Sequence, residues 1–433
     1  MTRPKVRDRL EQALDRIGDA GGEGARACLT VYREAARAAA DAADARSAAG
    51  VTLGPLDGVI VSIKDLFDIA GEVTRAGSKV LADEGIAAAA DAPVVQRLRA
   101  AGVVIVAKTN MTEFAFSGVG ANPHFGTPGN PADRARVPGG STSGGAVAVA
   151  DRMCDIAIGT DTGGSTRIPA ALCGIVGFKP SKRRIPTEGA FPLSYTLDSV
   201  GPMAHTVADC ALADAAMAGE PPWPPDPAPL AGLRLGIARG LPLEELDETV
   251  AAQFTAALTG LAKAGARLSH ETVPPLDAVR NANLKGGFAP AEAYAIHRER
   301  LHCHGDGIDP NVRGRIERGR EITAADYVEL VQLRVRLVQA MDVSLADLDA
   351  LVMPTTPIVA PKISKVADPD IFRTRNFLLL RNTGLANFFD LCAISLPLPR
   401  TTGLPVGLML IARNGHDRRL FRIAAAVEKV LVG

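Results

Sequence analysis

The 433-residue sequence lacks the features that are typical of several protein classes. Its six cysteines show no CxxC spacing, so neither a disulfide framework nor a cysteine zinc site is expected. Lys plus Arg equal Asp plus Glu, 48 against 48, which leaves no overall field to attract nucleic acid or an anionic membrane. No apolar run approaches the length of a membrane span, and the first residues have no signal-peptide core. We expect a cytoplasmic protein with reduced cysteines and with neither a nucleic-acid nor a membrane partner.

Motifs for common cofactors and nucleophiles are missing as well. The pair Gly118-x-Gly120 lacks the third glycine of a dinucleotide-binding loop, and no GKS or GKT phosphate loop occurs. His302-Cys303-His304 could suggest a metal cluster, but adjacent side chains point apart on a helix or strand, and no second ligand group stands nearby in the sequence. No serine lies in a GxSxG elbow. We therefore expect no cofactor and no metal.

What the sequence does contain is a β-α-β alternation of short apolar runs and helical spacings. Strands are predicted over 59–63, 103–107, 155–159, 175–178, 233–237, 350–353, 391–397 and 406–411. Helices are predicted over 92–102, 206–217, 246–265, 323–346 and the C-terminal residues. Helical spacing over 5–50 predicts two or three helices that pack on the body of the protein. This order indicates an α/β fold with a parallel or mixed sheet under helical cover.

Glycine is densest between residues 138 and 180, where it flanks Ser141 and Ser165. Because glycine is costly inside regular elements, such density indicates a place where the backbone approaches something closely. A serine hydroxyl becomes a good nucleophile only when a base takes its proton, and none of the seven histidines has a serine-hydrolase context. Lys64, at the end of the apolar run 59–63, is a candidate base, because burial lowers the pKa of a lysine. The alternative is a lysine that reaches solvent.

These segments resemble the amidase signature family of hydrolases. The resemblance covers residues 139–145, 159–169, 173–180, 55–65, 108–110, 122–123, 130–131, 201–203 and 404–407. It implies the amidase-signature fold, a twisted mixed β-sheet covered by helices on both faces, as a single domain over residues 1–433. In that domain, residues 1–50 form a helical segment packed on the rest. The six prolines within 221–229 then mark an internal surface connection.

The resemblance also implies the catalytic residues. They are a Ser-cisSer-Lys triad, with Ser165 as nucleophile, Ser141 as proton relay after a cis peptide bond, and Lys64 as the neutral base. An acyl-enzyme on Ser165 would then be hydrolysed by water. Backbone N–H groups that point at one spot can stabilise the negative oxygen of the reacting carbonyl. The expected oxyanion hole is formed by Thr162, Gly163, Gly164 and Ser165.

For the substrate, the resemblance places Ala115, Phe116 and Gly118 at the border of the acyl pocket, with the Ala115 carbonyl as an acceptor for the amide nitrogen. Ile168 stands three residues past Ser165, and an apolar side chain there argues against a carboxylate-bearing acyl group. We expect a small, uncharged carboxamide, or a related carbamate or ureide.

Two alternatives stay open within this resemblance. One is the glutamine-hydrolysing component of a tRNA-dependent amidotransferase, which passes ammonia to a partner. Ile168 and the length of the chain favour the amidase over this component. The other alternative is a catalytically silent member that acts by binding, which the presence of all three triad residues disfavours. The sequence leaves open whether the chain forms a homodimer.

Overall fold

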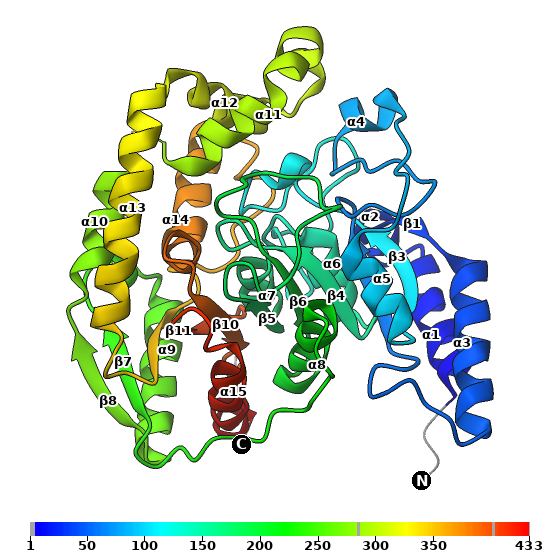
Figure 1. Cartoon of the computed structure of the whole chain (residues 1–433), viewed down its shortest axis with the longest axis horizontal. Helices are drawn as coiled ribbons and strands as arrows, with labels where there is room; N and C mark the ends of the chain where they lie inside the picture. The colour runs from blue at the N-terminus through cyan, green and yellow to red at the C-terminus, as the bar shows by residue number, and fades with distance from the viewer. Residues whose placement is uncertain (1–4, 284–285, 401–402, 433) are drawn as a thin grey trace.

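A computed structural model describes residues 5–283, 286–400 and 403–432 of the chain. Its centre is an eleven-stranded β-sheet (Figure 1). The strands follow one another across the sheet in the order β1 (Cys28–Val31), β3 (Val104–Thr109), β2 (Ile60–Lys64), β4 (Ile156–Thr160), β6 (Val200–Ala204), β5 (Val176–Lys179), β10 (Cys392–Pro397), β11 (Gly407–Ala412), β9 (Ala350–Pro354), β7 (Arg234–Ala238) and β8 (Arg267–Glu271).

The sheet is mixed in direction. Strand β2 is parallel to both of its neighbours, β3 and β4, and β7 is parallel to β8 and β9. The other six neighbouring pairs are antiparallel. Because parallel strands end at the same edge of a sheet, the last residues of β2 and β4 lie close together. Those residues are Lys64 and Thr160.

Helices cover both faces of the sheet, and the strand residues alternate between them. Val61 and Ile63 belong to the core beneath α5 (Pro93–Ala100), α8 (Val207–Ala218), α9 (Glu248–Lys263) and α15 (Asp417–Val432). Ile60 faces the opposite way, as the two-residue period of a strand requires, toward α1 (Val6–Gly18), α3 (Arg33–Ala48) and α6 (Ser143–Ala150). By the same alternation, Lys64 points to the α6 face.

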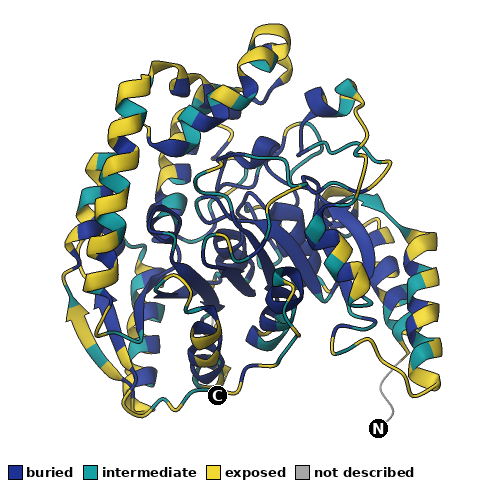
Figure 2. Ribbon diagram, in the orientation of Figure 1, coloured by how far each residue is buried: buried dark blue, intermediate teal, exposed yellow. Residues whose placement is uncertain are grey.

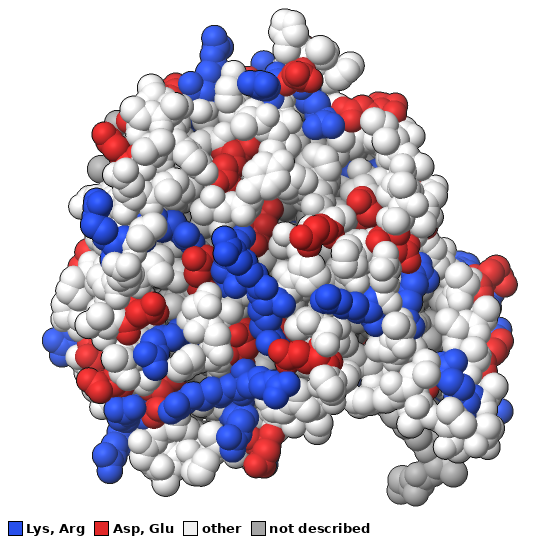
Figure 3. Space-filling view, viewed as in Figure 1, with Lys and Arg blue, Asp and Glu red and all other residues white. Residues whose placement is uncertain are grey.

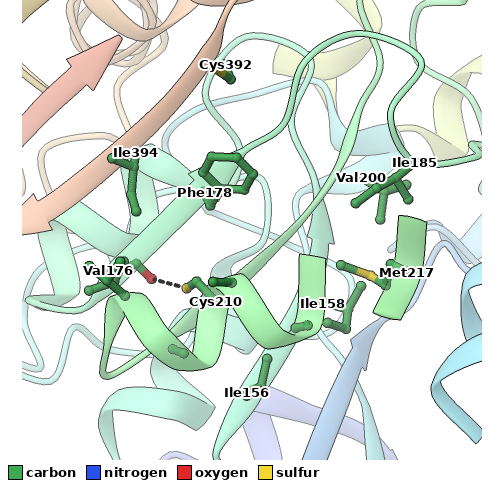
Figure 4. Packing of buried hydrophobic residues seen from close by; sticks show 14 of the residues in the cluster. Ile156, Ile158, Val176, Phe178, Ile185, Val200, Cys210, Met217, Cys392 and Ile394 are labelled. Atoms are coloured by element: carbon green, nitrogen blue, oxygen red, sulfur yellow. Dashed lines mark hydrogen bonds between the residues drawn. The ribbon is translucent and has the colours of Figure 1, made fainter. Parts of the chain in front are cut away.

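Further helices complete the two layers. At the β9 end of the sheet, a third apolar cluster packs beneath α10 (Pro274–Ala282), α13 (Ala324–Ser344) and α14 (Pro369–Phe388). The remaining helices are α2 (Gly24–Ala27), α4 (Lys79–Glu84), α7 (Arg167–Cys173), α11 (Phe288–His304) and α12 (Pro310–Glu317). Figure 4 shows how tightly the central layer packs, with Cys210 and Met217 of α8 against Ile156 and Ile158 of β4. Each fully buried side chain of this kind contributes about 1.5–3 kcal/mol.

The sequence expectations are confirmed for the mixed α/β architecture and wrong at one place near the N-terminus. Residues 28–31, which helical spacing assigned to the N-terminal helices, form β1 and pair antiparallel with β3. Thr30 and Val31 are β-branched and favour an extended backbone, and the pairing with an edge of the sheet decides the outcome. Strands β6 and β8 were not predicted.

The outer parts of the molecule are polar and mixed in charge. Figure 2 shows the central strands buried, whereas β8 and α13 at one edge carry exposed residues. On the face drawn in Figure 3, Lys and Arg side chains are interspersed with Asp and Glu. No helix in the described ranges has the length and apolar character needed to cross a membrane. Residues 221–229 have neither helix nor strand and lead from α8 to β7.

Candidate active site

Lys64 is completely buried at the end of β2. Its Nζ atom donates to Ser141 Oγ at 2.8 Å and to Thr160 Oγ1 at 2.9 Å. Both partners are neutral hydroxyls, so no carboxylate is hydrogen-bonded to Lys64 to stabilise its protonated, ammonium form. Burial therefore dominates and lowers the pKa of Lys64 to about 7, although the more distant charges of Asp198 and Asp161 oppose the shift. Near neutral pH this lysine can be an uncharged amine.

The position of Ser141 is fixed by close contacts between backbone segments. The peptide bond between Gly140 and Ser141 is cis. The Gly140 N–H donates to the Gly118 carbonyl at 2.9 Å, and the Ser141 carbonyl accepts from the Thr112 amide at 3.0 Å. A Cβ atom at Gly140 would lie 2.7 Å from the backbone of Gly120, so only glycine allows this approach. The loop that carries Ser141 is thereby fixed against the loop that contains Gly118.

Ser165 lies in the loop between β4 and α7, beside the loop of Ser141. Its carbonyl accepts a hydrogen bond from the Thr142 amide at 3.3 Å. Within the described chain, no hydrogen bond joins the Ser165 and Ser141 hydroxyls, so the contact between the two loops is made by backbone. The structure thus brings Lys64 and Ser141 into direct contact and places the backbone of Ser165 against Thr142, the residue that follows Ser141.

The loop before α7 offers unused backbone donors. In the described chain, no hydrogen-bond acceptor faces the N–H group of Thr162, Gly163, Gly164 or Ser165. Thr162, Gly164 and Ser165 are buried, and Gly163 is partly exposed. Buried backbone N–H groups are nearly always paired, so a run of free donors is a feature that calls for a partner. The arrangement can accommodate a negative oxygen.

Several side chains hold this loop in shape. Asp161 forms a buried ion pair with Arg167, with oxygen-to-nitrogen distances of 2.8 and 3.0 Å. Burial alone would raise the pKa of Asp161, but the charge and hydrogen bonds of Arg167 outweigh it and hold the pKa below its usual range. Asn387 of α14 donates to the same carboxylate at 2.9 Å. Thr162 Oγ1 donates to the carboxylate of the half-buried Asp198 at 2.5 Å.

The residues expected around the acyl pocket lie together. Ile168 is completely buried, and its Cδ1 atom would be 3.1 Å from a Cβ at Gly118 and 2.7 Å from a Cβ at Gly164. Ala115 has a φ of +58° and follows Phe114 at +50°, two left-handed positions in a row outside glycine. Such positions cost about 1–3 kcal/mol each and are common at functional sites. No hydrogen bond of the described chain uses the Ala115 carbonyl.

Two contacts in this region come from α14 and were not expected from the sequence. Thr383 Oγ1 donates to the Gly163 carbonyl at 2.6 Å, across a sequence separation of 220 residues. Leu380 lies beside Gly118 and Gly163. No local pattern marks either residue, because each acts only through a segment distant in the chain. By contrast, Thr160 stands inside the glycine-rich stretch at the end of a predicted strand, where its contact with Lys64 could have been anticipated.

The close packing around Gly164 leads to a prediction about the stability of the protein. Its φ is +134°, and a Cβ there would lie 2.2 Å from Thr383 Oγ1. We expect Gly164→Ala to lower the free energy of unfolding by about 3 kcal/mol, because steric overlap and backbone strain add. Urea-induced unfolding measures this loss. Gly163→Ala is the matched control: its φ is ordinary and its Cβ would meet only Leu380, at 3.2 Å, so the loss should be smaller. Equal losses for the two variants would contradict this account.

The metal candidates considered in the sequence are at the far end of α11. His302, Cys303 and His304 are exposed there. In the described part of the chain, no group of three or more His, Cys, Asp or Glu side chains is arranged to hold a metal ion.

The comparisons with known proteins agree on one family. The family described as Amidase matches residues 8–421. The 2-amino-5-chloromuconic acid deaminase of Comamonas testosteroni is 35% identical over 92% of this chain and 86% of that protein. A glutamyl-tRNA(Gln) amidotransferase subunit from Chloroflexus aggregans is 36% identical over 94% of this chain and 89% of that protein.

Solved structures agree with the sequence relatives. A crystal structure of an amidase superposes with a TM-score of 0.88 at 32% identity, and the match covers 99% of this chain and 97% of the other. The chain therefore belongs to the amidase signature family of amidohydrolases.

Proposed function

We propose that this enzyme hydrolyses the C–N bond of a small carboxamide, or of a related carbamate or ureide, through an acyl-enzyme on Ser165. The observation that carries the proposal is the buried Lys64 amine, 2.8 Å from Ser141 Oγ and bonded only to neutral hydroxyls. A neutral amine in that position can accept a proton from the serine hydroxyl, whereas the buried Lys179 donates to the backbone carbonyls of Pro180 and Leu391.

In the proposed acylation step, Ser165 Oγ bonds to the carbonyl carbon of the amide. The Ser165 proton passes to Ser141 Oγ, whose own proton passes to the Lys64 amine. The proton then returns through Ser141 to the amide nitrogen, the C–N bond breaks, and ammonia or an amine leaves. Water repeats the same relay on the ester, which restores Ser165 and releases the carboxylic acid. General acid–base catalysis of this kind contributes about 10² to 10⁴ in rate.

The negative oxygen of the tetrahedral intermediate is assigned to the free N–H groups of the loop from Thr162 to Ser165. These donors need no rearrangement, because Thr383, Asp198 and the ion pair of Asp161 already hold the loop. Donors fixed in advance in a water-poor site give large stabilisation of a developing charge. The Ala115 carbonyl is proposed to accept a hydrogen bond from the substrate amide nitrogen.

The alternative role is the glutamine-hydrolysing component of an amidotransferase, since relatives at similar identity carry an amidotransferase name. The apolar surroundings of Gly118 and Gly163, which are Ile168 and Leu380, support the simple amidase instead. Ammonia released from glutamine only after a partner protein is added would favour the alternative. Ammonia released from simple amides by the chain alone would favour the amidase.

The proposal is tested by the pH dependence of ammonia release from a panel of aliphatic and aryl amides. The pKa of Lys64 is lowered to about 7, and the deprotonated amine is the reactive form. Activity should therefore rise through pH 7 and level off above about pH 8, with about a tenth of the plateau at pH 6. Circular dichroism at each pH confirms that the protein stays folded. A profile that falls from pH 6 to pH 9 in the folded protein would rule out a neutral lysine base.

A further inference from the structure

Strand β8 ends the sheet on one side and lies at the surface of the molecule (Figure 1 and Figure 2). It pairs in parallel with β7, and α9 also contacts it. Arg267, Ser269 and His270 are exposed, whereas Leu268 and Glu271 are half-buried. An open sheet edge is a template for a further strand, because one side of its backbone has no partner.

The backbone groups of β8 point to two sides. The Arg267 N–H donates to a carbonyl just before β7 at 2.8 Å, and the Glu271 carbonyl accepts from an amide just after β7 at 2.9 Å. Since backbone groups alternate along a strand, those of Leu268 and His270 point away from β7. No hydrogen bond of the described chain outside the ladder between β7 and β8 uses the backbone of Leu268 or His270. The N–H and C=O groups of these two residues are therefore open to a further strand.

The order of side chains on β8 suits pairing with a second copy of the same strand. In an antiparallel pair centred on Ser269, Arg267 of one copy lies opposite Glu271 of the other. Leu268 lies opposite His270, and Ser269 lies opposite itself on the two-fold axis. Opposite charges directly across a strand pair contribute about 0.2–1 kcal/mol, and symmetry forms this pair twice. The strand is thus complementary to itself in charge.

The same register uses the open backbone groups. Antiparallel strands alternate between residue pairs that exchange two hydrogen bonds and pairs that exchange none. Leu268 and His270, whose backbone groups point outward, occupy the hydrogen-bonded positions, and Ser269 occupies a non-bonded one. A shift by one residue would place each outward-pointing residue opposite an inward-pointing one. A shift by two residues would separate Arg267 from Glu271, so charge and backbone together select a single register.

The charged side chains of β8 are free to form these pairs. Among the described residues, no ion pair includes Arg267 or Glu271, whereas Arg234, the residue of β7 in register with Arg267, lies 3.7 Å from Asp349. Two arginines therefore lie side by side on neighbouring strands, and Arg267 has no acidic side chain of its own. A carboxylate from a second copy would reduce the repulsion between these like charges.

The neighbouring helices leave room for a second copy. Helix α9 contacts both β8 and β9, so it lies across β7, the strand between them. In the pair, the two α9 helices would be about three strand spacings, or about 14 Å, apart, which exceeds the separation of about 8–10 Å between helices in contact. On the other face of the sheet, Arg267 and Ser269 are exposed, so no described helix covers β8 there.

We propose that two copies of this chain associate through β8 and form a dimer whose sheet is continuous across the two-fold axis. The axis passes through Ser269, and Arg267 of each copy pairs with Glu271 of the other. Because the edge pairs with itself, one partner occupies it fully and assembly stops at the dimer. A pair of five-residue strands is a small contact, so we expect a dissociation constant in the micromolar range.

Sedimentation velocity of the full chain between about 1 and 200 µM tests the association. Wild type should shift from monomer to dimer over this range, with no larger species. Arg267→Glu and Glu271→Arg should each raise Kd at least about 10-fold, because each places like charges opposite one another. A mixture of these two variants, in which every facing pair is again opposite in charge, should regain the wild-type Kd. Arg320→Glu, an equal change of charge at an exposed position of η4 (Arg318–Glu321), should match wild type. A monomer throughout the range, growth beyond the dimer, or a mixture that associates no more tightly than the separate variants overturns the proposal.

Cross-linking at Ser269 tests the register directly. In the proposed pair the Cα atoms of the two Ser269 residues are about 4.5 Å apart, within the range of a disulfide. Ser269→Cys should therefore form a covalent dimer under mild oxidation. The variant is made together with Cys303→Ser, because Cys303 is exposed and the other five cysteines are buried. His270→Cys in the same background is the control, since its two copies would be about 8 Å apart, beyond that range. Equal cross-linking of the two variants, or no cross-linking of Ser269→Cys, contradicts the register.

Proline at residue 270 removes an outward N–H donor and leaves the ladder to β7 intact. His270→Pro should therefore abolish the dimer and keep the wild-type unfolding midpoint in urea. Amide hydrolysis should also stay within about 2-fold of wild type, because β8 is at the far end of the sheet from β2 and β4, which carry Lys64 and Thr160. A dimer that survives in His270→Pro lies on another surface and overturns the proposal. Ammonia release from the same samples tests the proposed function separately, so either result can fail alone.

Discussion

Replacing Ser165 with alanine is expected to lower kcat for amide hydrolysis by at least about 10⁴-fold, because the acyl-enzyme can no longer form. The loss should not come from unfolding. Ser165 Oγ makes no hydrogen bond in the described chain, so its removal should change the free energy of unfolding by less than about 0.5 kcal/mol. Ammonia release under saturating amide, together with a urea unfolding curve, measures both quantities.

A neighbouring serine provides the control for Ser165. Ser143 begins α6, two residues after Ser141, and its buried hydroxyl has no partner in the described structure. Ser143→Ala should keep near wild-type activity and should still react with a fluorophosphonate, whereas Ser165→Ala should do neither. Residual activity of Ser165→Ala above about a hundredth of wild type would refute Ser165 as the nucleophile.

Replacing Lys64 with methionine is expected to lower kcat by about 10³-fold and to abolish the rise of activity near pH 7. Methionine has a similar length and no charge, so it fits a fully buried position. Because the wild-type amine loses hydration in this place, the variant should be at least as stable as wild type. Steady-state kinetics between pH 6 and pH 9 and a thermal unfolding curve provide the measurements.

Two other buried groups, Asp214 and Lys179, have pKa values near 7 to 8 and could also produce a rise of activity near pH 7. Burial raises the pKa of Asp214 to about 7, and burial with the charge of Arg167 lowers the pKa of Lys179 to about 8. Lys179 donates to the carbonyls of Pro180 and Leu391, which assigns it a structural role. If an active Lys64→Met variant still shows the rise of activity near pH 7, the proton acceptor is another group and not Lys64.

Sequence reasoning anticipated the parts of the site whose signals are local. The apolar run before Lys64 predicted β2, and the glycines around Ser141 and Ser165 predicted loops of close backbone approach. Both are present in the structure. These features can be predicted from the local sequence, because a buried strand requires apolar residues and a tight loop requires glycine at their own positions. The roles of Lys64, Ser141 and Ser165 remain predictions until the variants above are measured.

The strands β6 and β8 were not predicted, because their local sequences do not have the pattern of a buried strand. Strand β6 contains Gly201 and Pro202, residues that usually break strands, yet it lies in the interior of the sheet between β4 and β5. Strand β8 has the burial pattern of an exposed edge and no apolar alternation to reveal it. Thr383 gains its role from a contact with Gly163, which lies 220 residues earlier in the chain.

The origin of the pocket walls has an evolutionary consequence. Every group proposed to handle protons lies between residues 64 and 165, whereas Leu380 and Thr383, which lie beside Gly118, Gly163 and Gly164, belong to α14. Part of the surroundings of the nucleophile is therefore encoded far from the residues proposed for the chemistry. Random mutagenesis of the segment that encodes α14 should yield enzymes with altered substrate preferences while the reaction itself is retained.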